Sequence, residues 1–458
     1  MVATVAGRSV RVDVRGAVRA TRAEVARWPR PLRWWLVFLS VLIVIGAWGA
    51  VSSLLPGAEV FGTSPPVEWG LLIAAYVFFA VTTSGLCLSS SLGTVFQIER
   101  FLPLERRHAV LAVLSLVTAF GVIALDLHYP ERLVFGVVLS PSPWSPMWWM
   151  GVLYGIYLCF LLAEVWSIFA GHDRIHRAAC VLASIMAIIA PTTLGAVFGV
   201  LATRSFWYGP LTPPSLLVAA LLSGVALLGV AFCLVYRFRW RGYGRGTDLA
   251  IPSIRLLLVI VLVIALFLTF VQTSVGLYGG VPGPAGATEA LLTGPLAPLF
   301  WARLVLGLLL PLVLVLLPRT RTPAGLFAAC CLALAGVLLD RTAFVLAGQI
   351  APDTASSGIV STPFAEYVPS PVEISIVVGA AAFMAFVYTL AERFLDLGSF
   401  GGHGGPGLEF VARAAPEAKP APIEPGARTE ILPAETGVDQ ATGEPPGEPC
   451  PDGARSEP

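Results

Sequence analysis

The residues of this sequence that could do chemistry are charged side chains set within or directly beside long apolar runs. A charged group is costly to hold in an apolar environment, so such a residue is a candidate for function. Asp126 has the densest polar surroundings, because it closes an apolar run and opens the segment Asp126–Arg132, which also contains His128 and Tyr129. Side chains of these types exchange protons and hydrogen bonds, so the segment predicts acid–base chemistry. The full set is Asp126, Glu164, Arg303, Asp340, Arg341 and Glu373.

Each of these charges also has a purely structural interpretation. It can form an ion pair between helices, or its side chain can extend to the membrane surface. Glu164 lies about two turns from the end of its run and is open to either interpretation. Asp340 and Arg341 are neighbours in sequence and point about 100° apart on a helix, so they need not pair with each other.

The cysteines and histidines argue against a metal centre held by this chain. The seven cysteines show no Cys-x-x-Cys spacing, so an iron–sulfur cluster bound by this chain is not expected. A membrane haem needs two facing histidines inside helices. Three of the five histidines fall at or beyond one set of helix ends, and His172 and His176 are interpreted as part of a solvated loop. We therefore expect neither haem nor any other metal site.

The composition identifies the environment of these residues. Of 458 residues, 56% are hydrophobic and 12% are charged, about half the charged fraction of a soluble domain. Mean hydropathy is +0.81, which excludes an ordinary soluble enzyme and a chain that is disordered throughout. The net charge of +1 also argues against a nucleic-acid partner. The sequence therefore predicts an all-α integral membrane protein.

The charges divide the chain into three parts. Residues 1–33 are Arg-rich with a net charge of +6, residues 34–398 carry +1, and residues 399–458 are rich in Pro, Ala and Glu and carry −6. The middle part contains ten apolar runs long enough to cross a bilayer as helices. We expect a ten-helix membrane domain and a disordered cytoplasmic tail. The runs lie near 34–55, 67–95, 108–128, 147–170, 178–202, 213–236, 253–278, 297–317, 324–348 and 371–392.

Arginines set the expected orientation. If both termini are cytoplasmic, the cytoplasmic segments carry 20 arginines, whereas the outer segments carry Arg132 and Arg204. This asymmetry follows the positive-inside rule. Prolines such as Pro65, Pro146 and Pro371 are expected to begin the five even-numbered spans, all of which start at the outer face.

Several segments, in this order along the chain, resemble a known family. They are Gly85–Leu92, Arg100–Leu104, Ala124–Leu127, Pro130–Arg132, Thr193–Gly199, Phe206–Leu211 and Tyr367–Ile374. Together they resemble the polysulfide reductase (NrfD-like) membrane subunits, and most closely the ten-span branch found with hydrogenases and sulfur-cycle redox complexes. The similarity covers roughly residues 33–395.

The resemblance implies a quinone-interacting subunit of a multi-subunit respiratory oxidoreductase in the bacterial cytoplasmic membrane. Such a subunit holds no haem or iron–sulfur cluster and offers a pocket for menaquinone or ubiquinone near the outer face. A ferredoxin-like iron–sulfur partner docks there and leads to a large molybdopterin, nickel–iron or similar catalytic subunit. The chain would then be the quinone-reactive subunit and not the main catalytic one.

Roles for individual residues follow from that expectation. Asp126 and His128 would exchange protons with the quinone oxygens, and Glu164 could extend a proton path towards the cytoplasm. For the cofactor-binding residues, we expect hydrogen bonds from a tyrosine, charge stabilisation from an arginine and cover from an indole. These residues are Tyr129 or Tyr208, Arg132 or Arg204, and Trp207.

Two departures from the family pattern bear on these roles. The usual Asp-Leu-Gly-Arg-Pro is here Asp126-Leu127-His128-Tyr129-Pro130, and many relatives have a histidine where this chain has Pro191. If that histidine moves protons in relatives, this chain uses another route.

Two other functions suit a ten-span chain. A secondary transporter would explain charges inside the membrane, although matching interrupted helices do not recur in two halves of the sequence. A structural anchor would tether partners without binding quinone.

Overall fold

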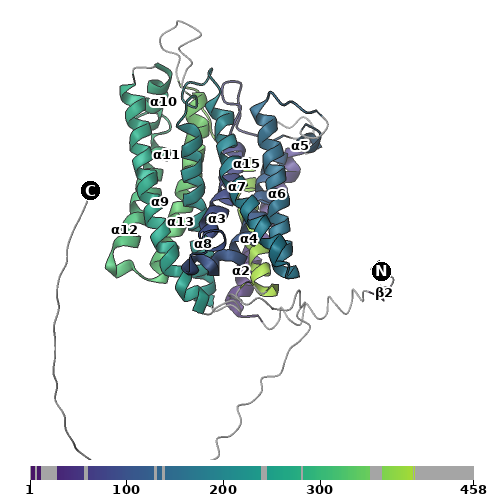
Figure 1. The fold of residues 1–458 in the computed structure, drawn as a ribbon. Coiled ribbons are helices and arrows are strands. Elements are labelled where there is room, and N and C mark those ends of the chain that lie inside the picture. Colours follow the sequence, from purple (N-terminus) through teal and green to yellow (C-terminus); the bar gives the residue numbers. More distant parts are fainter. Residues whose placement is uncertain are drawn as a thin grey trace, which may run out of the picture. The chain divides into compact units, whose positions relative to one another are not determined.

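Ten long apolar helices dominate the part of the chain that the computed structural model describes (Figure 1). The described residues are 2–5, 8–11, 28–55, 60–127, 131–136, 140–238, 245–279, 282–350, 364–395 and 397. The chain separates into two units, Met1–Val411 and Ala412–Pro458, and the second lies wholly outside the described residues. The predicted tail 399–458 therefore stays a prediction.

The ten predicted spans are confirmed. They are α2 Arg30–Ser53, α3 Leu71–Thr94, α4 Glu105–Asp126, α6 Pro146–Ala170, α7 Asp173–Gly199, α8 Thr212–Phe238, α9 Arg245–Tyr278, the composite span Ala297–Leu316, α13 Pro323–Ile350 and α15 Pro371–Phe394. The composite span consists of α11 Ala297–Ala302, the π-helix η3 Arg303–Leu309 and α12 Leu310–Leu316. The chain is a multi-pass integral membrane protein.

Short elements connect the long helices. They are the 3-10 helices η1 Glu99–Leu104 and η4 Pro318–Thr320, and the helices α5 Glu131–Val134 and α10 Pro282–Leu292. Near the N-terminus, strands β1 Val2–Val5 and β2 Arg8–Arg11 form an antiparallel hairpin with Val5 opposite Arg8. This hairpin was not predicted from the Arg-rich composition of the segment.

Two groups of four spans form the centre of the fold. In the first bundle α3, α4, α6 and α7 pack together, and in the second bundle α8, α9, α13 and the composite span do so (Figure 1). Helices α3 and α8 join the two bundles. Their positions explain their burial, since 78% of the apolar window of α3 is buried, compared with 22% for α2.

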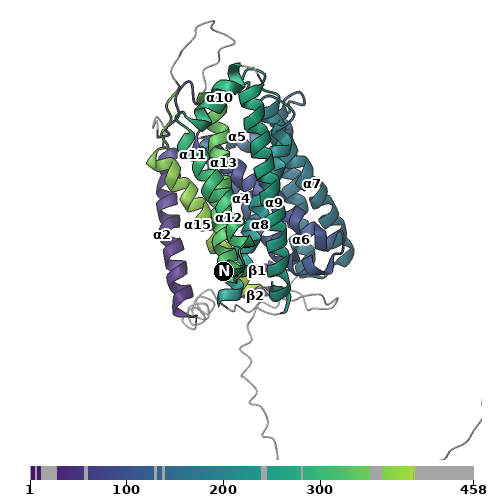
Figure 2. The same cartoon turned by 90° about the vertical axis from the view of Figure 1, so that its left-hand side faces the viewer.

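Helices α2 and α15 pack against each other beside the bundles, as Figure 2 shows. Gly46 and Gly379 face each other at this contact, where a side chain on either would overlap the partner backbone. A buried ion pair fixes α15 to α4, with 2.6 Å between Arg107 Nε and Glu392 Oε1. The phenol of Tyr388 also donates to Glu392 Oε1, so that carboxylate serves two donors.

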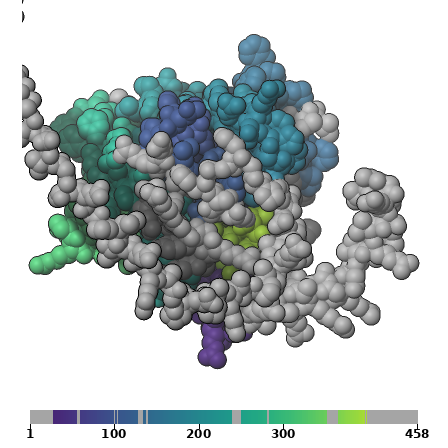
Figure 3. Space-filling view, turned by 60° about the horizontal axis from the view of Figure 1, so that its bottom comes forward, coloured from purple at the N-terminus to yellow at the C-terminus, as the bar shows by residue number. Residues whose placement is uncertain are grey.

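The helices alternate in direction, which gives the bundle two distinct ends. We call the end at which α3, α6, α8, α11 and α15 begin the proline end, and the opposite end the arginine end. Pro146 and Pro371 begin their helices as predicted. The prediction was wrong for the second span, because α3 begins at Leu71 and the preceding residues form a loop with a bridge between Ser64 and Val67. Figure 3 turns the arginine end towards the viewer, where α2 (purple), the α3–η1 region (blue) and α15 (yellow-green) are seen beside teal and green segments of the other helices.

The contact between α3 and α8 depends on glycine. A Cβ built on Gly85 would overlap the Ala220 carbonyl, whereas one built on Gly155 in α6 meets nothing within 4 Å. We expect Gly85→Ala to destabilise the purified protein by roughly 1–3 kcal/mol, because the two helices must separate. Gly155→Ala is the matched control and should leave the thermal midpoint unchanged or raised. Equal midpoints for the two variants would contradict this account of the bundle contact.

Candidate functional site

An aromatic cluster lies at the proline end between the two bundles. Trp207, in the loop between α7 and α8, is 2% exposed, and its ring stacks on that of Trp69 with 5.2 Å between centroids. Phe198 packs edge-on against both indoles. The indole N–H of Trp207 donates to the Phe344 carbonyl at 2.8 Å, and the Gln349 amide exchanges two hydrogen bonds with the backbone of Trp69. The structure thus places Trp207 in a buried position next to Trp69, which the sequence reasoning missed, and the predicted contact of Trp207 with a quinone stays a prediction.

A buried carboxylate organises the loops beside this cluster. Glu373 is 1% exposed and lies in the first turn of α15. Its Oε2 accepts hydrogen bonds from the backbone N–H groups of Gly62 and Ser370, at 3.0 and 2.8 Å. Its Oε1 accepts from the Tyr367 phenol at 2.7 Å, and the phenol oxygen accepts from the N–H of Leu71 at the start of α3. Glu373 thus ties three segments together at the proline end.

Asp126 belongs to the same region. It is the last residue of α4, it is half-buried, and it lies close enough to Glu373 and Tyr367 for electrostatic interaction with both. Burial and the hydrogen bond to Glu373 raise the pKa of Tyr367 above its usual range, so this phenol remains a proton donor. Asp126, Tyr367 and the Trp69–Trp207 pair therefore form one connected network, joined through the loop that ends at Leu71.

The other predicted site residues vary in how far they are described. His128 and Tyr129 lie outside the described residues, and so does the side chain of Arg132 in α5. Arg204 is half-buried and begins the turn that carries Trp207. The backbone N–H of Trp207 donates to the Arg204 carbonyl at 3.0 Å. The side chain of Tyr208 is 60% exposed, so it lies at the surface and not in the aromatic cluster.

Glu164 occupies a second site, inside the first bundle near the arginine end. Its Oε1 lies 2.9 Å from His108 Nε2, and both residues are 1% exposed. Asp126 and His108 lie at opposite ends of α4, about 27 Å apart along the helix.

The placement of His108 at a helix end is confirmed, but it is buried there. The loop interpretation of His176 was wrong, because α7 begins at Asp173 and places His176 in its first turn.

Polar side chains connect this pair to the arginine end. The Cys180 thiol lies 3.5 Å from Glu164 Oε1 and 3.5 Å from His176 Nε2. His176 Nε2 in turn lies 2.5 Å from Glu105 Oε1, and the Glu105 side chain is 31% exposed. An unbroken chain of titratable groups therefore leads from the surface to the buried His108–Glu164 pair.

The same chain continues towards the proline end along α3 and α6. The Cys87 thiol lies beside the pair and is hydrogen-bonded to Tyr157. Tyr154 and Ser84 lie beyond it, and Tyr76 interacts with Tyr154. Two atoms of the buried pair, His108 Nδ1 and Glu164 Oε2, have no hydrogen-bond partner among the described residues, and ordered water satisfies such atoms in proteins.

Three of these residues also have the donor types of a metal site. One ligand atom from each of Cys87, His108 and Glu164 lies within 4.8 Å of the other two. Tetrahedral zinc with ligands at about 2.1 Å separates neighbouring donors by about 3.4 Å. The 2.9 Å between His108 and Glu164 is instead a direct hydrogen bond, so the geometry favours proton exchange. Sequence spacing could not reveal this cluster, because its members come from three helices.

Arg303, Asp340 and Arg341 form a third polar cluster, within the second bundle. Arg303 Nε lies 2.8 Å from Asp340 Oδ1, an ion pair between helices of the kind that the structural interpretation allowed. Asp340 and Arg341 also pair although they are neighbours in sequence, because Nε and Nη2 of Arg341 both donate to Asp340 Oδ2.

The sequence profile described as "Polysulphide reductase, NrfD" matches residues 59–353, more than half of the chain. The chain belongs to this family. The matched range contains the eight spans of the two bundles, whereas α2 and α15 lie outside it. The recognised resemblance is therefore confirmed.

Three relatives extend the match over most of the NrfD-family chain. It is 28% identical to a putative dimethyl sulfoxide reductase membrane subunit of Halobacterium salinarum, over 80% of this chain and 91% of the relative. It is 24% identical to an Hdr-like menaquinol oxidoreductase integral membrane subunit of Archaeoglobus fulgidus, over 79% of this chain and 92% of the relative. It is also 24% identical to a selenate reductase subunit of Mesobacillus selenatarsenatis, over 78% of this chain and 93% of the relative.

Proposed function

We propose that this chain is the quinone-reactive membrane subunit of an oxidoreductase complex. Its relatives are named as membrane subunits of a dimethyl sulfoxide reductase and of a menaquinol oxidoreductase. The observation that carries the proposal is the network at the proline end, where Asp126, Tyr367 and Glu373 lie next to stacked Trp69 and Trp207. Flat apolar rings and a few convergent polar groups are the usual features of a small-molecule site.

Quinone oxidation and reduction require both acid–base groups and a partner that donates or accepts electrons. Reduction of a quinone to a quinol takes up two electrons and two protons, and oxidation releases them. Asp126 exchanges protons with one quinone oxygen, and His128 serves the second oxygen. Tyr129 donates a hydrogen bond to a quinone oxygen, because Tyr208 lies at the surface and the Tyr367 phenol already donates to Glu373. Arg132 or Arg204 stabilises negative charge on the reduced ring. The Trp69–Trp207 pair covers the ring and excludes water.

Protons reach this site through the first bundle. Glu105 and His176 collect them at the arginine end, Cys180 and Glu164 pass them inwards, and His108 holds them next to Cys87. Tyr157, Tyr154 and Tyr76 extend the route, with water bridging their hydroxyl groups. Such a route does not require the histidine that Pro191 replaces.

Electrons pass to or from a docked ferredoxin-like iron–sulfur subunit, which leads to a large molybdopterin or nickel–iron catalytic subunit. The partner docks at the proline end, because electron tunnelling requires a short distance to the quinone. The arginine asymmetry supports an orientation with the proline end on the outer side of a bacterial cytoplasmic membrane and both termini in the cytoplasm.

Photoaffinity labelling of the purified complex with an azido-menaquinone tests this proposal. We expect the label in peptides containing Trp69 or Trp207, with labelling abolished by excess unlabelled menaquinone. Uniform labelling of the lipid-facing α2 and α9 without competition would contradict a quinone site and favour a structural anchor. Solute uptake by liposomes containing this chain alone would favour a transporter.

A further inference from the structure

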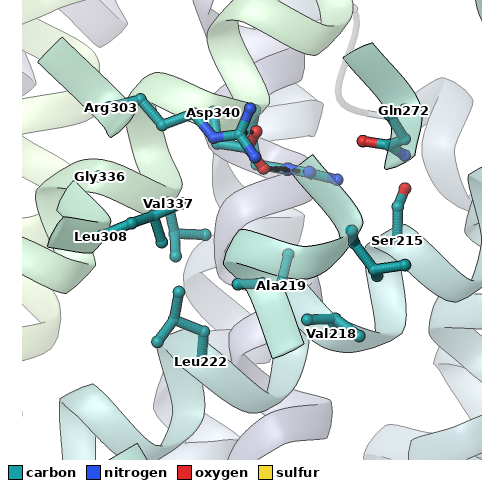
Figure 4. A pocket seen from close by; sticks show the side chains of 13 residues that line it. Ser215, Val218, Ala219, Leu222, Gln272, Arg303, Leu308, Gly336, Val337 and Asp340 are labelled. Carbon is teal, nitrogen blue, oxygen red and sulfur yellow. Dashed lines mark hydrogen bonds and ion pairs between the residues drawn. The ribbon is translucent and has the colours of Figure 1, made fainter. Parts of the chain in front are cut away.

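A cavity inside the second bundle is lined by more positively charged than negatively charged side chains. Figure 4 shows Arg303 and Asp340 at one side of it, with Ser215 and Gln272 opposite. An adjoining cavity of about 50 Å³ shares these residues and extends to Thr288 of α10. Among the described residues that line the two cavities, the charged side chains are the guanidinium groups of Arg303 and Arg341 and the carboxylate of Asp340.

One of these guanidinium groups is incompletely paired. Arg341 binds Asp340 through Nε and Nη2, but its Nη1 is buried without a hydrogen-bond partner among the described residues. The Arg341 side chain is 4% exposed, so bulk water does not solvate it. Arg303 uses Nε for Asp340 and Nη2 for the Thr269 hydroxyl, at 2.7 Å. Arg341 therefore lines the cavity with a guanidinium group whose Nη1 has no acceptor among the described residues.

The excess positive charge has a cost that the described residues do not offset. An arginine in a protein cannot release its proton, so one carboxylate shared by two arginines leaves a net charge of +1 in an apolar region. The ring of Phe344 lies 5.2 Å from the Arg341 guanidinium carbon and offsets only a part of this cost. A bound anion would offset the remainder.

The local helix geometry also marks this position as unusual. Arg303 begins the π-helical segment Arg303–Leu309, and π-helical turns within α-helices often occur at functional sites. In the same segment Gly307 packs directly on Gly336 of α13, so the two helices approach closely below the ion pair. This close contact holds Arg303 and Asp340 in register.

We propose that this cavity binds a phosphate-type oxyanion, either free or as the headgroup of an anionic lipid. Arg341 Nη1 and the Gln272 amide donate to it, whereas the hydroxyl groups of Ser215 and Thr288 line the cavity and donate to backbone carbonyls of Thr212 and Pro284. A volume of about 50 Å³ holds roughly three or four water-sized groups, which suits a tetrahedral oxyanion and is too small for a fused quinone ring. The site is therefore separate from the proposed quinone site, although Phe344 contacts both Arg341 and Trp207.

Phosphorus analysis and thermal unfolding of the full-length protein test this proposal. We expect the purified wild-type protein to retain about one phosphorus atom per chain, and the Arg341→Gln variant to have lost it. Added phosphatidylglycerol or inorganic phosphate should raise the thermal unfolding midpoint of the delipidated wild-type protein. The reference is the same protein in chloride at equal ionic strength. Arg341→Gln should require at least about tenfold more of the effective probe, because a charged donor is removed. Arg341→Lys should restore part of the effect.

The matched control is Arg255→Gln, which removes a guanidinium that contacts the Thr322 carbonyl at the arginine end. It should bind phosphorus as wild type does. If Arg341→Gln does not fold, Gln272→Leu provides the same comparison without a change in charge. Stabilisation by the lipid alone identifies a headgroup site, and stabilisation by both probes identifies a free-anion site. No response to either probe, or an equal response in wild type and both cavity variants, would overturn the proposal.

Discussion

Replacing Asp126 by Asn is expected to reduce quinone-linked turnover of the assembled complex by about a hundredfold or more. The substitution keeps the shape of the side chain but removes its ability to exchange a proton, and such groups commonly contribute about 10² to 10⁴ in rate. Folding should be unaffected, because Asp126 lies beside the buried Glu373 carboxylate and the change removes a like charge. The measurement is the steady-state rate with a soluble menaquinol analogue.

Glu289→Gln is the matched control for this prediction. Glu289 is an exposed carboxylate in α10 at the same end of the bundle, so the variant makes the same change in charge away from the network. It should retain wild-type turnover. Asp126→Asn with wild-type turnover and wild-type affinity would remove Asp126 from the mechanism and leave His128 as the candidate.

Much of this fold could be predicted from the sequence, because hydropathy alone controls which segments cross a membrane. The ten spans follow directly from apolar runs of sufficient length. The start of α9 at Arg245 was missed, since its first turns are polar and lie outside the apolar window. The start of α3 was also misjudged, because Pro65 and Pro66 belong to a loop held by Glu373 through Gly62.

The site was only partly predictable. Trp207 and Asp126 were identified by motif, but their link through Trp69, Tyr367 and Glu373 depends on loops that meet only in three dimensions. The His108–Glu164 contact was missed for the same reason. Histidine at a helix end normally suggests solvent, and burial by α6 and α7 is invisible to a one-dimensional pattern.

The role of Glu164 leads to the second large effect. Glu164→Gln is expected to slow quinone-linked turnover by about ten- to a hundredfold, because an amide cannot carry a proton between Cys180 and His108. The amide retains the size of the carboxylate, so assembly should be preserved. Proteoliposomes containing a pH-sensitive dye measure both the rate and the side from which protons are taken up.

Glu164→Asp distinguishes a proton relay from simple packing. It shortens the side chain and disturbs packing more than Gln does, yet it restores the carboxyl group. A relay therefore predicts a faster Asp variant than Gln variant, whereas packing predicts the reverse order. The Asp126 site and the relay also separate experimentally: Asp126→Asn should block chemistry at every pH, whereas Glu164→Gln should be partly rescued by small permeant acids that deliver protons through water. Failure of such acids to speed the Gln variant would argue that Glu164 only pairs with His108.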